Sequence, residues 1–155
     1  MRRRSKPVSE VTDAERSILE QMVELMRLSG GLGLAAPQVG INKQMVMVDV
    51  GAGLVTLINP RILKKTGSEV MEEGCLSLPG VYVKVRRARK IVVSGYNEQN
   101  EKVTLAACDL FARALQHEID HLRGRLIIDH ANFIQKIRLR IKLKDMRQED
   151  VDGLF

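Results

Sequence analysis

The chain has 155 residues, a length that fits one domain with a core of ordinary size, so we expect a single domain over residues 1–155. No apolar run approaches the length of a membrane helix, and the basic N-terminus lacks the apolar stretch of a signal peptide. The net charge of +6 lies largely near the two ends, with no aromatic residues interleaved. We therefore expect no membrane association and no specific nucleic-acid site, while proximity to RNA stays open.

Apolar periodicity predicts helices near both ends of the chain and strands between them. The segment 12–15 has the form of a capping box and begins a helix of about sixteen residues that ends near Gly30. Strands are expected at 44–50, 54–59, within 62–71, and at 81–85, 90–96 and 102–107. A second helix follows over 110–123, and a C-terminal helix over 131–146.

Two segments between these elements are rich in small or turn-forming residues. Residues 31–40 fit neither a helix nor a strand, and their glycines permit close approach of a backbone or ligand. Gln38 is a polar amide in this otherwise apolar run, which suits a hydrogen bond to a substrate. Residues 72–80 read as a turn-rich segment that contains Cys75.

The second helix contains the pattern H-E-x-x-H. Successive helical residues turn by about 100°, so His117 and His121 share one face, with Glu118 beside it. All three fall in the apolar arc, where a carboxylate without a partner is costly. A metal ion between the histidines is one explanation, and core histidines capped by the glutamate, or a chance match, are the others. The polar side chains gather in a separate stripe: Arg113, Gln116, Asp120 and Arg123.

A catalytic site of this kind needs a third protein ligand and an open position for water. Cys75 is a candidate, although a buried structural cysteine is the common alternative. Cys108 competes with it, but it lies about 13 Å along the predicted helix from His117, which is too far to share an ion.

Three segments in this order resemble peptide deformylase. Residues 31–38 match G-x-G-L-A-A-x-Q, residues 73–77 match E-G-C-L-S, and residues 116–122 match Q-H-E-x-D-H-L. The resemblance implies an α+β fold, with small sheets of mainly antiparallel strands packed around a central H-E-x-x-H helix and a helix at each end. It implies a metal-dependent hydrolase that removes the formyl group from the N-terminal formyl-methionine of nascent polypeptides and releases formate. Members generally open with a strand that precedes the region resembled by residues 4–8, and we expect that strand to be absent here.

The same motifs imply roles for particular residues. The metal ligands would be Cys75, His117 and His121, and Glu118 would be the acid/base. The ion would be Fe(II) in the cell, with Zn(II) or Ni(II) in some preparations.

The substrate would meet a further group of residues. Gln38 and the backbone N–H of Leu76 would contact the reacting oxygen. The substrate backbone would approach Gly31 and Gly33, and the methionine side chain would enter a pocket formed by Leu32, Leu76 and Leu110. The partners would be formyl-methionyl nascent peptides, with the ribosome left open, in the bacterial cytoplasm or an organelle matrix.

Two other functions stay open on the residues alone. A zinc endopeptidase would share the H-E-x-x-H helix and take its third ligand downstream, where Asp129 and His130 are the near candidates. An inactive relative that binds RNA or the ribosome through its basic ends is the second, and metal-independent, salt-sensitive binding would favour it.

Overall fold

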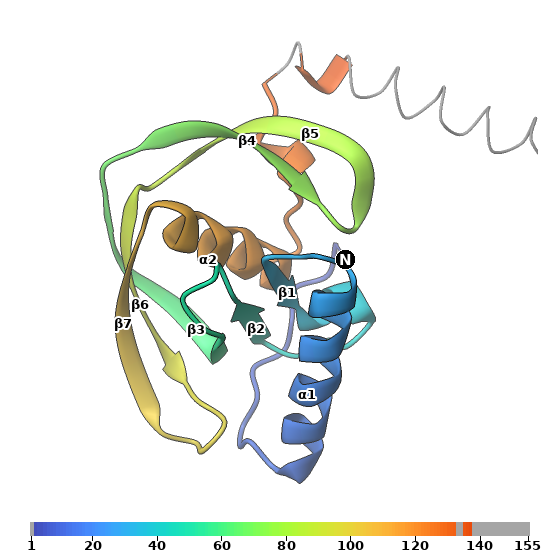
Figure 1. The fold of residues 1–155 in the computed structure, drawn as a ribbon, viewed down its shortest axis with the longest axis vertical. Coiled ribbons are helices and arrows are strands. Elements are labelled where there is room, and N and C mark those ends of the chain that lie inside the picture. The colour runs from blue at the N-terminus through green and yellow to red at the C-terminus, as the bar shows by residue number, and fades with distance from the viewer. Residues whose placement is uncertain (1, 133–134, 138–155) are drawn as a thin grey trace, which may run out of the picture. The chain divides into compact units, whose positions relative to one another are not determined.

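The computed structural model describes residues 2–132 and 135–137 (Figure 1). The elements follow in the order α1 (Asp13–Leu28), β1 (Gly33–Ala35), η1 (Ala36–Val39), β2 (Met45–Val48), β3 (Val55–Thr66), β4 (Glu69–Cys75), β5 (Leu78–Arg87), β6 (Lys90–Tyr96), β7 (Lys102–Cys108), α2 (Asp109–Leu122) and η2 (Ile127–His130). The expected α+β class with antiparallel strands is confirmed. Most of the C-terminal helix predicted over 131–146 lies outside the described residues. None of the described helices is both long enough and apolar enough to cross a membrane.

The chain divides into two compact units. The first contains the described residues up to Glu69 together with Arg86–Leu126, and the second contains Val70–Val85 and the described residues from Ile127 onward. The second unit has its own small core, to which Val81, Val83 and Ile127 contribute. A single domain over residues 1–155 stays a prediction.

The first unit is built on a five-stranded sheet in the order β1-β2-β3-β6-β7, in which every neighbouring pair is antiparallel. Helix α2 lies against one face of this sheet (Figure 1). The core between them consists of fully buried side chains from both layers, among them Val46, Leu57, Val93, Ala112, Leu115 and Ile119. A second cluster buries the apolar side of α1 through Leu19, Met22 and Met26. The sheet and the first of these cores therefore fix the position of α2, which carries the histidines.

Helix α1 begins at the predicted capping box. Thr12 is the N-cap, and the carboxylate of Glu15 accepts its backbone N–H at 3.0 Å. The same carboxylate also accepts hydrogen bonds from the Thr12 hydroxyl and the Lys43 ammonium. These contacts, of which the one with Lys43 is the largest, lower the pKa of Glu15 from 4.5 to about 2. The box thus joins the start of α1 to the segment before β2.

Two asparagines hold the segment that precedes α1. Asn59 and Asn100 have φ angles of 52° and 63°, a left-handed conformation that short polar side chains tolerate. The Asn59 side chain accepts the Val8 N–H at 2.9 Å and donates to the Val8 carbonyl at 2.7 Å. Asn100 bonds both backbone groups of Val11 in the same way, at 2.7 and 2.9 Å. Val8 and Val11 are therefore paired as strand residues would be, but with side chains as partners. Nearer the N-terminus, Lys6 forms a parallel backbone bridge with Lys43.

Strand β3 is longer than predicted. The prediction ended a strand at Asn59 because Pro60 has no N–H to donate to a ladder. The register of β3 against β6 shifts between Ile58 and Arg61, which places Asn59 and Pro60 in an irregularity of the bulge type. The missing N–H therefore interrupts no regular ladder bond, and the strand continues to Thr66.

Two segments predicted to be irregular are partly regular. Residues 33–35 form β1 because they pair with β2, from Gly33 opposite Val48 to Ala35 opposite Val46. The turn-rich segment 72–80 is also shorter than predicted, since β4 continues to Cys75 and β5 begins at Leu78. In both cases pairing with a distant or returning strand overrides a weak local preference.

We expect Glu15→Gln to remove part of the acid sensitivity of folding. A carboxyl group with a lowered pKa stabilises the fold above its unfolded pKa of about 4.5, and that stability is lost as the pH falls toward 2. The variant should lose about 0.5–1 kcal/mol near pH 7, and this loss should shrink as the pH falls and vanish below pH 2. Urea denaturation at several pH values measures this. Glu20→Gln, at an exposed position of the same helix, is the control, and equal pH profiles for the two variants would contradict the prediction.

Candidate metal centre

Helix α2 brings the two histidines of the motif together. The ring centroids of His117 and His121 are 4.8 Å apart, with the rings nearly perpendicular at 77°. The side chain of His121 is almost fully buried, at 1% exposure, and Glu118 is buried at 4%. The helical spacing therefore places both rings on one face, as the sequence predicted.

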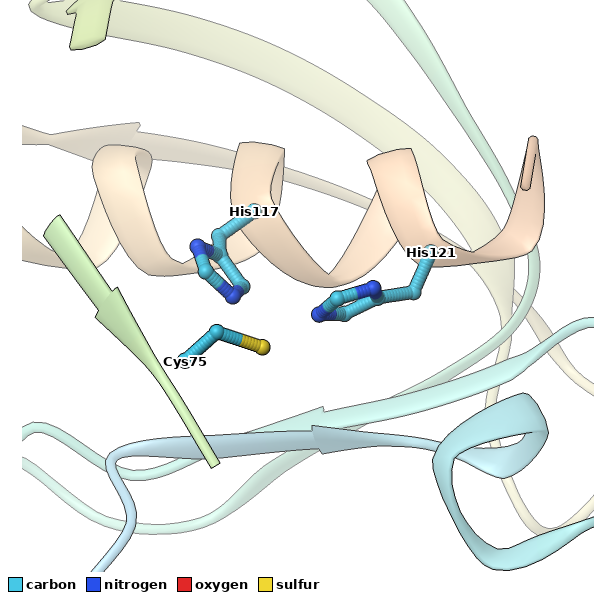
Figure 2. Close-up of side chains that lie close together, drawn as sticks. All are labelled: Cys75, His117 and His121. Carbon is cyan, nitrogen blue, oxygen red and sulfur yellow. The ribbon is translucent and has the colours of Figure 1, made fainter. Parts of the chain in front are cut away.

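Cys75 supplies a third donor. The potential ligand atoms of Cys75, His117 and His121 all lie within 4.8 Å of one another (Figure 2). One thiolate and two imidazoles suit Zn(II) or Fe(II), and three protein donors leave a position for a non-protein ligand. Cys108, by contrast, is an exposed residue at the N-cap of α2 and does not belong to this group. The donor set fits a catalytic metal ion.

Glu118 packs directly against Gly33 of β1. A Cβ atom at position 33 would lie 2.7 Å from Glu118 Oε1 and 3.1 Å from its Cδ. Only glycine leaves room for the carboxylate in its observed position. The family resemblance implies that Gly33 lies along the substrate backbone. In the structure, Gly33 contacts the carboxylate of Glu118, the residue next to His117.

The other predicted site residues lie on separate segments. Gln38, in η1, accepts the backbone N–H of Ala35 at 2.7 Å through its side-chain oxygen, which fixes the carboxamide. The apolar side chains of Leu32, Leu76 and Leu110 are 48%, 44% and 45% exposed. The N–H of Gly31 donates to the Met26 carbonyl at 3.0 Å.

Three residues of the polar stripe of α2 are buried and hydrogen-bonded, which sequence reasoning missed: Arg113, Gln116 and Asp120. The fourth, Arg123, is exposed. Gln116 donates to the Ala88 carbonyl at 2.8 Å and accepts the Ala88 N–H at 3.1 Å. Asp120, next to His121, accepts a 2.7 Å charged hydrogen bond from Arg87. These contacts set how α2 is rotated about its axis. The sequence did carry a signal for this burial. Besides its stripe of polar residues, the helix has ionisable side chains within its apolar arc, so no side of it is purely apolar.

An α+β fold that carries a Cys-His-His donor group, with a buried carboxylate beside one histidine, defines the class of metal-dependent hydrolases. The model of the polypeptide deformylase family matches residues 1–137.

Individual relatives give the same result. A peptide deformylase of Halothermothrix orenii is 50% identical over 131 residues, which are 83% of this chain and 85% of the relative. One of Syntrophomonas wolfei is 47% identical over 131 residues, covering 84% and 86% of the two chains. The crystal structure of the Thermotoga maritima peptide deformylase has 44% identity and a TM-score of 0.82, covering 84% of this chain and 90% of that one.

The chain belongs to the peptide deformylase family, whose members are metal-dependent hydrolases that remove the N-terminal formyl group from nascent peptides. This result favours the deformylase interpretation over the endopeptidase alternative. In agreement, Asp129 and His130 of η2 are not members of the metal-binding group.

We expect Gly33→Ala to destabilise the protein by about 1–3 kcal/mol, because the new methyl group must displace the Glu118 carboxylate. The same substitution in a Glu118→Ala background removes the clash and should cost at least about 1 kcal/mol less. Urea denaturation of the two single variants and the double variant measures this coupling. An equal loss of unfolding free energy in both backgrounds would show that the contact between Gly33 and Glu118 does not contribute to this effect.

We expect Arg87→Leu to cost about 3–5 kcal/mol, because it leaves the buried Asp120 carboxylate without its guanidinium partner. Arg89→Leu is a matched control. It breaks an ion pair with Asp109 of the same 2.7 Å length, but with side chains 61% and 57% exposed, and should cost far less stability because water screens both charges. Chemical denaturation compares the two, and similar losses would refute the role given to burial.

Proposed function

We propose that Cys75, His117 and His121 bind one divalent metal ion and that Glu118 is the acid/base in removal of the formyl group. The observation that carries this proposal is the group formed by the thiol and both imidazoles, with a buried carboxylate adjacent to His117. The family supplies the reaction, and the motif positions supply the roles. The bond broken is that between the formyl carbon and the α-nitrogen of the N-terminal methionine.

The ion is Fe(II) in the cell, and Zn(II) or Ni(II) can replace it in a preparation. The soft thiolate and the two imidazoles support an ion of this kind over Mg²⁺ or Ca²⁺, which prefer oxygen donors. When bound, the ion acts as a Lewis acid that makes water a stronger acid and polarises the formyl carbonyl. Anaerobic purification followed by metal analysis tests the identity of the ion.

Glu118 moves the proton. Its carboxylate accepts a proton from the attacking water as the new C–O bond forms, and delivers it to the α-nitrogen as the C–N bond breaks. Formate and a free α-amine are the products, so one water is consumed and no other reactant is needed. The close fit of Gly33 holds the carboxylate in one position for both transfers.

Gln38 and Leu76 stabilise the negative charge that develops on the formyl oxygen. The oxygen of the Gln38 side chain is engaged by the Ala35 N–H, so the NH2 group is the part that can donate. The backbone N–H of Leu76 provides a second donor. Preorganised donors of this kind typically each contribute a few kcal/mol to the transition state.

The methionine of the substrate binds near Leu32, Leu76 and Leu110, and its backbone lies along Gly31 and Gly33. The exposure of the three leucines supports this assignment, because an apolar side chain that meets a ligand must be accessible. The substrate is the nascent polypeptide, and we propose that the enzyme acts near the ribosome in the bacterial cytoplasm. The bacterial origin of its relatives supports that compartment.

A formate-release assay tests the function. The metal-loaded protein should release formate from a formyl-methionyl peptide and should not cleave an internal peptide bond. Cleavage of internal bonds without formate release would favour an endopeptidase and overturn the proposal.

We expect Glu118→Gln to retain the metal and lose formate release by a factor of at least about 10², because the amide cannot accept the proton of the attacking water. Metal content by elemental analysis and turnover on a formyl-methionyl peptide are measured together. Near-normal turnover with bound metal would remove Glu118 from its assigned role.

Cys75→Ser and Cys108→Ser should separate the two cysteines. We expect the first to lower metal affinity at least about tenfold, since it replaces a thiolate with a weak hydroxyl ligand. We expect the second to leave affinity unchanged, because Cys108 is exposed and outside the donor group. Competition with a chelator measures both. Equal metal loss in the two variants would point to another ligand set.

A further inference from the structure

The register of strands β3, β6 and β7 assigns residues to the face of the sheet that is turned away from α2. Partners in an antiparallel pair project to the same face, and alternate residues of a strand share a face. Ile91, Val93 and Ala107 belong to the core with α2, so the residues between them lie on the opposite face. Ile58, opposite Tyr96, is on this side too but is buried in the cluster with α1. We call the rest of this surface the outer face, and its members are Arg61, Lys64, Thr66, Lys90, Val92, Ser94, Tyr96, Lys102, Thr104, Ala106 and Cys108.

The outer face is basic. All its charged residues carry positive charge, namely Arg61, Lys64, Lys90 and Lys102, and all four are exposed. The acids that adjoin it along β7 are Glu101, which precedes the strand, and Asp109, which is paired with Arg89. Sequence analysis placed the basic charge near the ends of the chain, and the strand register reveals this second group, whose members lie far apart in sequence.

The basic side chains form an extended array. Neighbouring strands are about 4.8 Å apart and alternate residues about 7 Å, so the array from Lys102 to Lys90 extends over roughly 20 Å. Lys64 and Lys90 are diagonal neighbours, a separation of about 7–8 Å at which like charges repel. The positions between the cations are mostly small: Ser94, Thr104, Ala106 and Cys108.

This chemistry fits a polyanion that carries regularly spaced charges. A protein partner would be held by buried aromatic or large aliphatic anchors, and a membrane surface by apolar side chains that insert. Among the outer-face positions only Tyr96 and the half-buried Val92 come near that description. A nucleic acid needs neither, because exposed cations neutralise phosphates and release counterions.

We propose that the outer face of β3, β6 and β7 binds the sugar-phosphate backbone of a nucleic acid without regard to base sequence. The interaction is separate from the metal centre and does not rest on the proposed function. The long side chains of Arg61, Lys64, Lys90 and Lys102 each neutralise a phosphate, and the small residues between them let the backbone approach the sheet.

Binding of the full-length protein to labelled duplex RNA and duplex DNA, measured by fluorescence anisotropy at several salt concentrations, tests this. The variant Lys64→Gln/Lys90→Gln removes the two neighbouring cations at one end of the array. It should weaken binding to either duplex about tenfold or more at low salt. It should also reduce the slope of log K against log salt by about 1.8, since each phosphate contact contributes about 0.9.

Arg3→Gln/Arg27→Gln is the matched control, because it removes the same charge from exposed positions off the outer face. It should retain the wild-type affinity and slope, and both variants should keep the wild-type melting temperature and formate release. Equal weakening in the two variants would mean that only net charge matters and would overturn the proposal. Unchanged duplex binding by the Lys64/Lys90 variant would also overturn it. So would a variant that binds anionic vesicles more weakly than the wild type but binds both duplexes equally well.

Discussion

Helix α2 turns charged and amide side chains toward the interior, and each of them needs a partner at a fixed place. The guanidinium of Arg87 can meet Asp120 in only one rotation of the helix, and the two hydrogen bonds between Gln116 and Ala88 require the same rotation. A slip of one residue would leave a buried charge unpaired, which is strongly destabilising. The orientation of His117 and His121 therefore depends on residues that are not themselves metal ligands. Hydrogen bonds behind the ligands commonly determine how the ligands are oriented toward a metal ion.

The segment between α1 and β2 affects the site in a different way, by leaving space for the Glu118 carboxylate. The carboxylate of Glu118 occupies the volume that a side chain at position 33 would fill, so β1 must carry glycine there even though glycine weakens a strand. The strand is short, and its pairing with β2 compensates for that weakness. Backbone, rather than another side chain, thus forms the wall beside this acid, and the arrangement exchanges local strand stability for a defined position of one functional group.

The sequence predicted well the features that depend only on residues close together in the chain. The capping box at Thr12 and Glu15 marked the start of α1, and the spacing of His117 and His121 fixed their shared face. Features that depend on pairing at a distance were missed or misjudged. Strand β3 passes through Pro60 because a register shift against β6 accommodates it, and the basic outer face arises only when residues from three strands are placed in register. Cys75 was singled out by its motif, since no local periodicity connects it with α2.

The attachment of the N-terminal segment has a chemical consequence. Its contacts at Val8 and Val11 depend on the side-chain amides of Asn59 and Asn100, and an asparagine that loses its amide nitrogen can no longer donate. That reaction starts with attack by the backbone nitrogen of the next residue. Asn59 is protected because Pro60 has no N–H, whereas Asn100 precedes Glu101 and has no such protection. Spontaneous deamidation would therefore turn a carboxylate toward the carbonyl of Val11 and release the chain there first, and peptide mapping of stored protein would find aspartate and isoaspartate at position 100.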